Sequence, residues 1–508
     1  MSSNSSIAKN TMFLYFRMIL IMAVQLYTVR VVLSVLGSTD YGLNNVVGGI
    51  VTMFSFLSGT MATASQRYFA FEIGRNDMVQ LKKTFSLTLI IYCLLGFIIL
   101  LLAETVGLWF LNNKMVIPED RMNAANWVYQ FSVFSFIVTM FQVPYDALVI
   151  AREKMNVYAY VSIFEVVLKL LIVYLLSISS FDKLITYSFL TFSVTLIITS
   201  IYKSYCIRNY KESHFKFFWD KKLFKEITSY SGWNLFGALA GVANNQGINI
   251  LINLFFGPTI NAARGIAYQI NSSINGFVQN FMTASKPQIT KLYAQGNIKE
   301  LNILIERTSK FSFLLLLLIV LPVGLETSFI LKIWLKDFPE YTVVFVQLIL
   351  INTLVDTISY ALMAGAQATG KIKTYQATVG TIMLLNIPIS YIFLKIGIEP
   401  YQVLYINISI SVICLFFRLF FLKKLIKLEI SHFLKEVVLK VFILTLVVLL
   451  IMYQLKKYLN EETLVNFIII SVLSVVLIIF FSYLLILSKI EKQLIKSFID
   501  KKLLKKIK

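Results

Sequence analysis

The sequence predicts an all-α polytopic membrane protein with about 14 transmembrane helices, and three observations support this fold class. Of its 508 residues, 58% are hydrophobic and only 14% are charged, whereas a soluble domain carries roughly a quarter charged residues. The apolar residues form continuous runs of about 20 residues, the length that a helix needs to cross a bilayer. Segments of about ten alternating residues, which are typical of membrane β-barrels, do not recur.

The apolar runs can be placed along the chain because short polar segments separate them. The N-terminus, Met1 to Asn10, lacks the basic region and the cleavage site of a signal peptide. We therefore expect the first run to remain as a membrane anchor. The runs begin near Thr11, Tyr41, Thr84, Asn123, Asn156, Lys183, Tyr230, Pro258, Arg307, Glu340, Lys371, Glu399, Lys435 and Thr463.

Basic residues are unevenly divided between the two sides of this arrangement. The N-terminus, the even-numbered loops and the C-terminal tail hold most of the 47 Lys and Arg residues. The segment from Lys203 to Lys225 is rich in basic residues, whereas the turns at 37–40 and 257–260 have none. The positive-inside rule therefore predicts that both termini are cytoplasmic. The net charge of +21 then reflects membrane topology, and no nucleic-acid partner is expected.

The chain contains an internal repeat. Gly37-Ser-Thr39 aligns with Gly257-Pro-Thr259, and Thr63-Ala-Ser65 aligns with Thr283-Ala-Ser285 at the same spacing. Each half holds six helices, so the two repeats are parallel, and a cavity is expected between two six-helix lobes. The predicted parts are an N-lobe at 1–208, a cytoplasmic interfacial linker at 209–228, a C-lobe at 229–425, two extra helices at 426–488 and a basic amphipathic tail at 489–508.

Polar residues follow one face of several predicted helices. In hydrocarbon such side chains must face protein or water, and a full-depth stripe present in both repeats favours a hydrated cavity. The alternative is hydrogen bonding between helices, for which one or two polar residues per helix suffice. The candidate substrate-binding residues in these stripes are Asn45, Gln66, Asn245, Asn249, Tyr268, Asn271, Asn275 and Gln279.

Three arginines within the spans are further substrate-binding candidates: Arg17, Arg30 and Arg264. A guanidinium group binds phosphate oxygens with two parallel hydrogen bonds, so these side chains could form an anion clamp. The alternative is that each extends to the lipid headgroups and keeps its charge in water.

Acidic residues within the spans are candidates for ion coupling or gating. Glu165 and Lys169 are one helical turn apart, so they form either a self-neutralising ion pair or a site that takes up and releases a cation or proton. Asp146 and Asp356 are unpaired in the sequence and are second candidates for coupling.

No enzymatic or metal-binding pattern is present. The sequence lacks a phosphate-binding loop and a His-Glu-x-x-His motif, and its two histidines, His214 and His432, fall in predicted cytoplasmic loops. The three cysteines lie in or beside apolar runs, where they are expected to behave as small buried hydrophobic residues. We therefore expect a protein that is not an enzyme and needs no cofactor.

Several of these features together resemble a known family. They are Asn10 and Arg17 in the first helix, the turn from Leu36 to Gly42, the Asn- and Gln-rich seventh and eighth helices, and the two six-helix repeats. The pattern resembles the polysaccharide-transporter branch of the multidrug/oligosaccharidyl-lipid/polysaccharide (MOP) flippase superfamily, and O-antigen flippases in particular, with a MATE-like fold.

The resemblance implies transport of an undecaprenyl-diphosphate-linked oligosaccharide across a bacterial inner membrane, with the polyprenyl tail left among the membrane lipids. It also implies coupling to H+ or Na+, and a glycan polymerase and a chain-length regulator as partners. Arg17, Arg30 and Arg264 match the cationic residues that the family places in its cavity, and Asp40 matches an acidic residue at the start of the second helix.

Three alternatives remain open. A lipid II flippase of the same superfamily also has 14 helices. A cation-coupled multidrug exporter would take amphipathic cations, which cavity-facing arginines disfavour. A non-transporting scaffold for a glycan assembly complex would not need polar stripes of full membrane depth.

Overall fold

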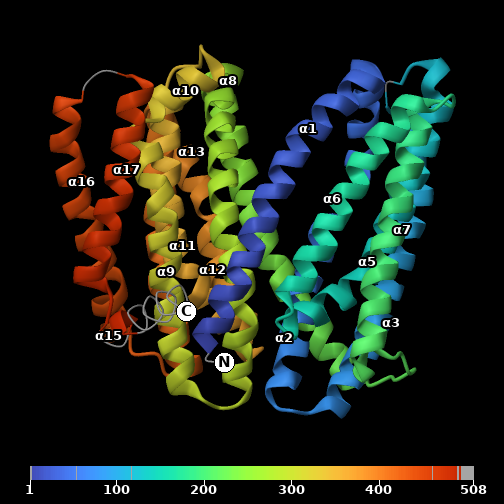
Figure 1. Cartoon of the computed structure of the whole chain (residues 1–508), viewed down its shortest axis with the longest axis horizontal. Coiled ribbons are helices and arrows are strands. Elements are labelled where there is room, and N and C mark those ends of the chain that lie inside the picture. The colour runs from blue at the N-terminus through green and yellow to red at the C-terminus, as the bar shows by residue number, and fades with distance from the viewer. Residues whose placement is uncertain (1–2, 53, 116, 460–461, 489–490, 494–508) are drawn as a thin grey trace, which may run out of the picture. The chain divides into compact units, whose positions relative to one another are not determined.

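The computed structural model describes residues 3–52, 54–115, 117–459, 462–488 and 491–493 (Figure 1). Most of the predicted basic tail at 489–508 therefore lies outside the described residues. The described chain is helical, with no β-strand, as the long apolar runs predict. It forms two compact units: unit 1 comprises residues 1–238, 283–297 and 370–373, and unit 2 comprises the rest. The predicted lobe and linker boundaries remain a prediction.

Unit 1 contains seven helices and parts of an eighth. They are α1 (Ser3–Thr52), α2 (Ser55–Gly74), α3 (Met78–Leu102), α4 (Leu108–Asn113), α5 (Met122–Ala151), α6 (Met155–Ile178), α7 (Lys183–Asn209) and both ends of α8 (Lys221–Ala294). One-turn helices η1 (Ala103–Gly107), η2 (Glu119–Arg121) and η3 (Lys211–Ser213) connect some of these.

Unit 2 contains the middle of α8 and the helices that follow it. They are α9 (Ile298–Leu325), α10 (Thr327–Leu335), α11 (Thr342–Thr369), α12 (Lys373–Leu384), α13 (Asn386–Ile396), α14 (Val403–Ile426), α15 (Ile430–Phe433), α16 (Lys440–Tyr458) and α17 (Leu464–Phe481), with η4 (Pro400–Gln402), η5 (Leu434–Leu439) and η6 (Ser482–Ile486).

Twelve helices in the described part of the chain are long and apolar enough to cross a membrane. The count of 14 remains a prediction. α1 and α8 are each assigned as a single helix, although one glycine with non-helical backbone angles interrupts each of them. Gly37 has φ 79° and ψ 168°, and Gly257 has φ 81° and ψ −177°. Glycine adopts this conformation because it has no Cβ. The two glycines that the internal repeat aligns thus have the same backbone conformation.

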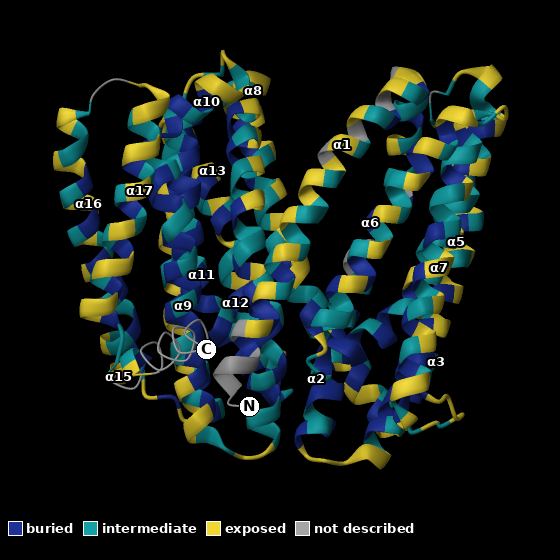
Figure 2. Ribbon diagram, viewed as in Figure 1, coloured by how far each residue is buried: buried dark blue, intermediate teal, exposed yellow. Residues whose placement is uncertain are grey.

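Many large apolar residues are exposed on helices of both units, and Figure 2 shows exposed residues, in yellow, along α16. On α3, for example, Phe97 is 60% exposed, and on α16 Leu450 is 57% exposed. A soluble protein rarely exposes such contiguous apolar faces, whereas a bilayer core solvates them. This distribution agrees with a multi-pass membrane protein.

In unit 1, α5 packs against α2, α3 and α7, and α1 packs against α6. The C-terminal end of α8 also belongs to unit 1, where it approaches α2 very closely. A Cβ atom at Gly74 would lie 2.9 Å from the Cβ of Ala294 and 2.9 Å from the Cα of Lys291. Lys291 forms an ion pair with Glu153, which also accepts a hydrogen bond from Gln288. Glycine therefore permits the contact between α2 and α8, and the ion pair joins the same end of α8 to the turn between α5 and α6.

In unit 2, α11 packs against α9 and α14, and α17 packs against α9. Figure 1 shows α16 and α17, in red, beside each other. The chain after α17 is tied back to α9, because the Glu491 carboxylate lies 3.3 Å from Arg307 Nε and 3.8 Å from Lys310 Nζ. The two helices outside the predicted repeat are therefore packed on unit 2.

Candidate functional site

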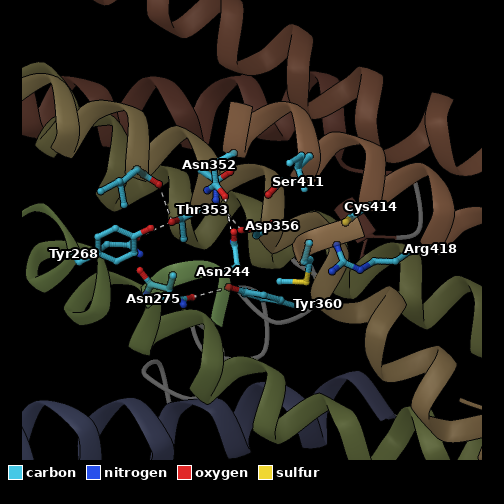
Figure 3. A pocket seen from close by; sticks show the side chains of 16 residues that line it. Asn244, Tyr268, Asn275, Asn352, Thr353, Asp356, Tyr360, Ser411, Cys414 and Arg418 are labelled. Carbon is cyan, nitrogen blue, oxygen red and sulfur yellow. Dashed lines mark hydrogen bonds between the residues drawn. The ribbon is translucent and has the colours of Figure 1, made fainter. Parts of the chain in front are cut away.

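Unit 2 contains a partly open cavity of about 170 Å³ among α8, α11, α12 and α14 (Figure 3). We call it the amide cavity, because asparagines supply six of its lining residues. Its polar lining consists of Asn244, Asn245, Tyr268, Asn271, Asn275, Asn352, Thr353, Asp356, Tyr360, Asn407, Ser411, Cys414 and Arg418. Four of these, Asn245, Tyr268, Asn271 and Asn275, are predicted substrate-binding residues.

Helical periodicity brings the lining residues to one place. On α11, Asn352, Asp356 and Tyr360 are four residues apart, so all three project from one face of the helix. On α14, Asn407, Ser411, Cys414 and Arg418 have the same kind of spacing. The two halves of α8 contribute from either side of the Gly257 break.

Three asparagines form a hydrogen-bonded network beside the cavity. The side-chain amide of Asn386 donates to Asn244 Oδ1 and to Asn407 Oδ1, both at 2.9 Å. Ser390 Oγ donates to Asn386 Oδ1 at 3.1 Å. Asn386 is fully buried and is the first residue of α13 after the interruption that follows α12. This network holds α8, α13 and α14 together through side chains.

A second set of hydrogen bonds joins α8 to α11. Thr353 Oγ1 donates to Asn271 Oδ1 at 2.7 Å, and Tyr360 Oη donates to Asn275 Oδ1 at 3.3 Å. Within α11, the amide of Asn352 donates to Asp356 Oδ2 at 2.9 Å. The amides therefore connect helices by hydrogen bonds, which is the alternative explanation for the polar stripes. They also line the amide cavity.

The amide cavity contains buried polar atoms with no protein partner. Arg418 is only 6% exposed, and its Nε and Nη1 have no hydrogen-bond partner among the described residues. Asn352 Oδ1 is also buried and has no hydrogen-bond partner among the described residues. Arg418 lines the cavity together with Asp356, which carries the opposite charge. The lining therefore has no formal net charge and offers unsatisfied donors and an unsatisfied acceptor.

Arg264 lies next to the amide cavity and is only 3% exposed. Its Nη1 donates to Asn249 Oδ1 at 2.9 Å, and its Nη2 donates to Asn245 Oδ1 at 2.6 Å. The guanidinium carbon lies 4.3 Å from the centre of the Tyr268 ring, a cation–π contact. Four predicted substrate-binding residues are thus brought together, and two of the three guanidinium nitrogens already have protein partners.

The remaining predicted substrate-binding residues do not themselves line the amide cavity. In unit 1, the Arg17 guanidinium lies 4.6 Å from the Tyr158 ring centre, Arg30 and Asn45 are exposed, and Gln66 on α2 is half-buried. In unit 2, Gln279 is exposed on α8, and its side chain is hydrogen-bonded to Tyr360, which lines the amide cavity. Arg30 and Arg264 belong to different units, and their pairing as an anion clamp remains a prediction.

The coupling candidates have varied surroundings. Glu165 and Lys169 form an ion pair at 2.6 Å, and both side chains are more than a third exposed. Asp146 accepts a hydrogen bond from Gln142 at 3.0 Å, and its Oδ1 is buried with no partner among the described residues. Asp356 lines the amide cavity. Their roles in coupling remain predictions.

Asp40 belongs to an ionic cluster near the starts of α5 and α7. Arg121 Nε donates to Asp40 Oδ1 at 2.8 Å, and Arg121 Nη1 donates to Asp182 Oδ2 at 2.7 Å. Burial raises the pKa of Asp182, but hydrogen bonds from the Ile185 and Leu184 backbone and from Arg121, together with the Arg121 charge, outweigh it and lower the pKa below its usual value. The cluster thus joins α1, η2 and α7 through charges.

Sequence reasoning missed part of the amide cavity. It selected Asp356 on α11, but it did not select Asn352, Asn407 or Arg418, which α11 and α14 also supply. The spacing of three or four residues between the polar residues of α14 is the signal that could have revealed them. No group of three or more metal-binding side chains occurs in the part of the chain that the structure describes.

Solved transporters share this fold. A structure described as MATE in the straight conformation matches with a TM-score of 0.69 at 14% identity, over 84% of this chain and 97% of that chain. An outward-facing multidrug resistance MATE family transporter of the MOP superfamily matches with a TM-score of 0.67 at 14% identity, over 81% and 95%. A MOP superfamily transporter from Pyrococcus furiosus, described as having a binding pocket of reverse polarity, matches with a TM-score of 0.65 at 14% identity, over 83% and 97%. The fold is that of a MOP superfamily transporter.

A family model described as polysaccharide biosynthesis protein matches residues 7–293, more than half of the chain. The protein therefore belongs to this polysaccharide biosynthesis family. No curated protein matches the chain. The predicted all-α, MATE-like fold and the resemblance to the MOP flippase superfamily are thus confirmed, and a transporter family is consistent with a protein that is not an enzyme.

Proposed function

We propose that this protein is a flippase that moves an undecaprenyl-diphosphate-linked oligosaccharide across the bacterial inner membrane by alternating access. The observation that carries the proposal is the amide cavity in a chain of the polysaccharide biosynthesis family. A lining with no formal net charge that is rich in amides and hydroxyl groups suits sugar hydroxyl groups, which both donate and accept hydrogen bonds.

Solvation explains why such a protein is needed. Sugars and a diphosphate lose their water when they enter hydrocarbon, and the cost is large unless other polar groups replace that water. Asparagine side chains can replace it inside a helical unit, because each offers two donors and a carbonyl acceptor. The polyprenyl tail needs no such replacement and stays among the membrane lipids.

The remaining parts of the proposal concern the orientation of the protein in the membrane, the energy source of transport and the partner proteins. Both termini face the cytoplasm, as the basic loops indicate, and a proton or sodium gradient drives transport. Glu165 with Lys169, Asp40, Asp146 and Asp356 are the candidate coupling or gating residues. A glycan polymerase and a chain-length regulator would act on the product on the outer side.

Deletion of the gene in its host tests the function directly. We expect lipid-linked oligosaccharide to accumulate on the cytoplasmic leaflet and surface polysaccharide to be lost, with both restored by the intact gene. Unchanged lipid-linked intermediates in the deletion strain would refute the proposal. In vesicles containing the purified protein, lipid-linked oligosaccharide, lipid II and a cationic drug should be supplied in parallel. Transport of only lipid II or only the drug would favour the corresponding alternative, and transport of none would favour the scaffold.

Arg30 provides a variant for the same assay, since it is exposed and its replacement removes no buried packing. Arg30→Ala should slow transport of the diphosphate-linked substrate, and Arg30→Lys, which retains the charge, should slow it less. Equal rates for the native protein and both variants would remove Arg30 from the substrate site.

A further inference from the structure

The amide cavity has a hydrogen-bonding requirement that the protein itself does not meet. Two donor nitrogens of Arg418, Nε and Nη1, and the carbonyl acceptor of Asn352 are buried without partners among the described residues. Buried polar groups in proteins are nearly always paired with protein, water or ligand. Because both donors and an acceptor are left over, the complementary molecule must both accept and donate hydrogen bonds.

The size of the cavity limits what it can hold. Its volume of about 170 Å³ equals that of roughly six water molecules at about 30 Å³ each. Pockets for drug-sized ligands are larger, about 300–1,000 Å³. The cavity therefore suits one small ring with its substituents, and because it is partly open, the rest of an oligosaccharide can lie outside it.

The charge of the lining further restricts which class of ligand the cavity can bind. Of the described residues that line the cavity, only Asp356 and Arg418 are charged, and their charges cancel. Figure 3 shows Arg418 and Cys414 on α14 at one side of the pocket and Tyr268 and Asn275 at the other. A neutral hydroxyl group can donate to Asp356 and accept from Arg418, whereas an ion attracted to one of these residues faces a like charge on the other. The aromatic ring of Tyr268 adds an apolar surface.

We propose that the amide cavity is a subsite for a single uncharged sugar ring, with Arg418, Asn352 and the neighbouring asparagines bonding to its hydroxyl groups. The inference rests on the proposed function. It assigns the binding of one sugar of the carried glycan to unit 2. It predicts that recognition of that residue is separable from recognition of the diphosphate.

Two substitutions on α14 test the subsite. Ser411 lines the cavity, so Ser411→Leu fills it with an apolar side chain. Ser409 is on the same helix and is exposed, so Ser409→Leu is a matched control that makes the same change outside the cavity. If Ser411→Leu does not give a folded protein, Cys414→Met provides a second way to fill the cavity, since Cys414 also lines it.

The first measurement is binding of free glucose, galactose and N-acetylglucosamine to the purified full chain in detergent, with glucuronate as the charged comparison. We expect saturable binding of at least one neutral sugar, unchanged in Ser409→Leu and weakened at least about tenfold in the filled variant. Absence of binding to the native chain, equal binding by the filled variant or preference for glucuronate would each overturn the subsite.

The second measurement is transport of lipid-linked oligosaccharide by the same variants in vesicles. Slower transport by the filled variant than by Ser409→Leu supports the subsite. Equal transport by the two variants overturns the subsite but leaves the proposed function intact. If the native chain moves no lipid-linked oligosaccharide, the proposed function fails, whatever the result of the sugar-binding measurement.

Discussion

The contact between α2 and the C-terminal end of α8 makes a quantitative prediction for Gly74→Ala. The added Cβ would lie 2.9 Å from the Cβ of Ala294 and the Cα of Lys291, and 3.0 Å from the Lys291 carbonyl oxygen. Carbon atoms in good contact are about 3.5–4.0 Å apart. Two of the three neighbouring atoms are backbone atoms, so a rotamer change cannot relieve the overlap and the helices must move apart.

The cost follows from this geometry. Overpacking of a close contact destabilises a protein by about 1–3 kcal/mol, whereas replacing glycine by alanine within a helix stabilises it by roughly 0.5–1 kcal/mol. The first effect is larger, so Gly74→Ala should lower the free energy of unfolding. Gly59→Ala on the same helix is the control, because no described atom lies within 4 Å of its Cβ position. It should be neutral or stabilising.

Thermal unfolding of the purified protein in detergent measures both variants under the same conditions. The melting temperature should fall for Gly74→Ala, fall further for Gly74→Val, and stay level or rise for Gly59→Ala. If Gly74→Ala melts at or above the temperature of the native protein, the close helix contact does not exist and the reasoning is wrong.

Three further predictions concern charged groups. Because the pKa of Asp182 is lowered in the folded protein, its ionised form stabilises the fold above about pH 4, and this contribution disappears in more acidic solution. Arg121→Ala should therefore flatten the pH dependence of the melting temperature in this range. A pH profile equal to that of the native protein would contradict this prediction. If the pair of Glu165 and Lys169 is only structural, the double alanine variant should transport better than either single variant, whereas equal inactivity of all three favours a role in coupling. Arg264→Ala should cost about 1–3 kcal/mol for each buried amide oxygen left unpaired, measured by thermal unfolding, and a melting temperature equal to that of the native protein would show that its hydrogen bonds do not stabilise unit 2.

The sequence alone determined the fold class and much of the local structure. Continuous apolar runs require helices in a membrane, because every backbone polar group must be paired within the segment. The repeat alignment also selected Gly37 and Gly257, which share the same positive-φ conformation. The i,i+4 spacing of Glu165 and Lys169 was sufficient to predict their contact, which is local to one helix.

The tertiary structure decided which polar residues meet. Helical spacing shows which residues share a face, but it does not show which helix that face contacts. The bonds from Arg264 to Asn245 and Asn249 depend on the angle that the Gly257 break gives the two halves of α8. Arg418 and Asn352 lie on helices that look apolar by composition, and only the packing of α11 against α14 brings them into one cavity. The sequence shows the local periodicity of each helix, whereas the formation of a cavity depends on how several helices pack.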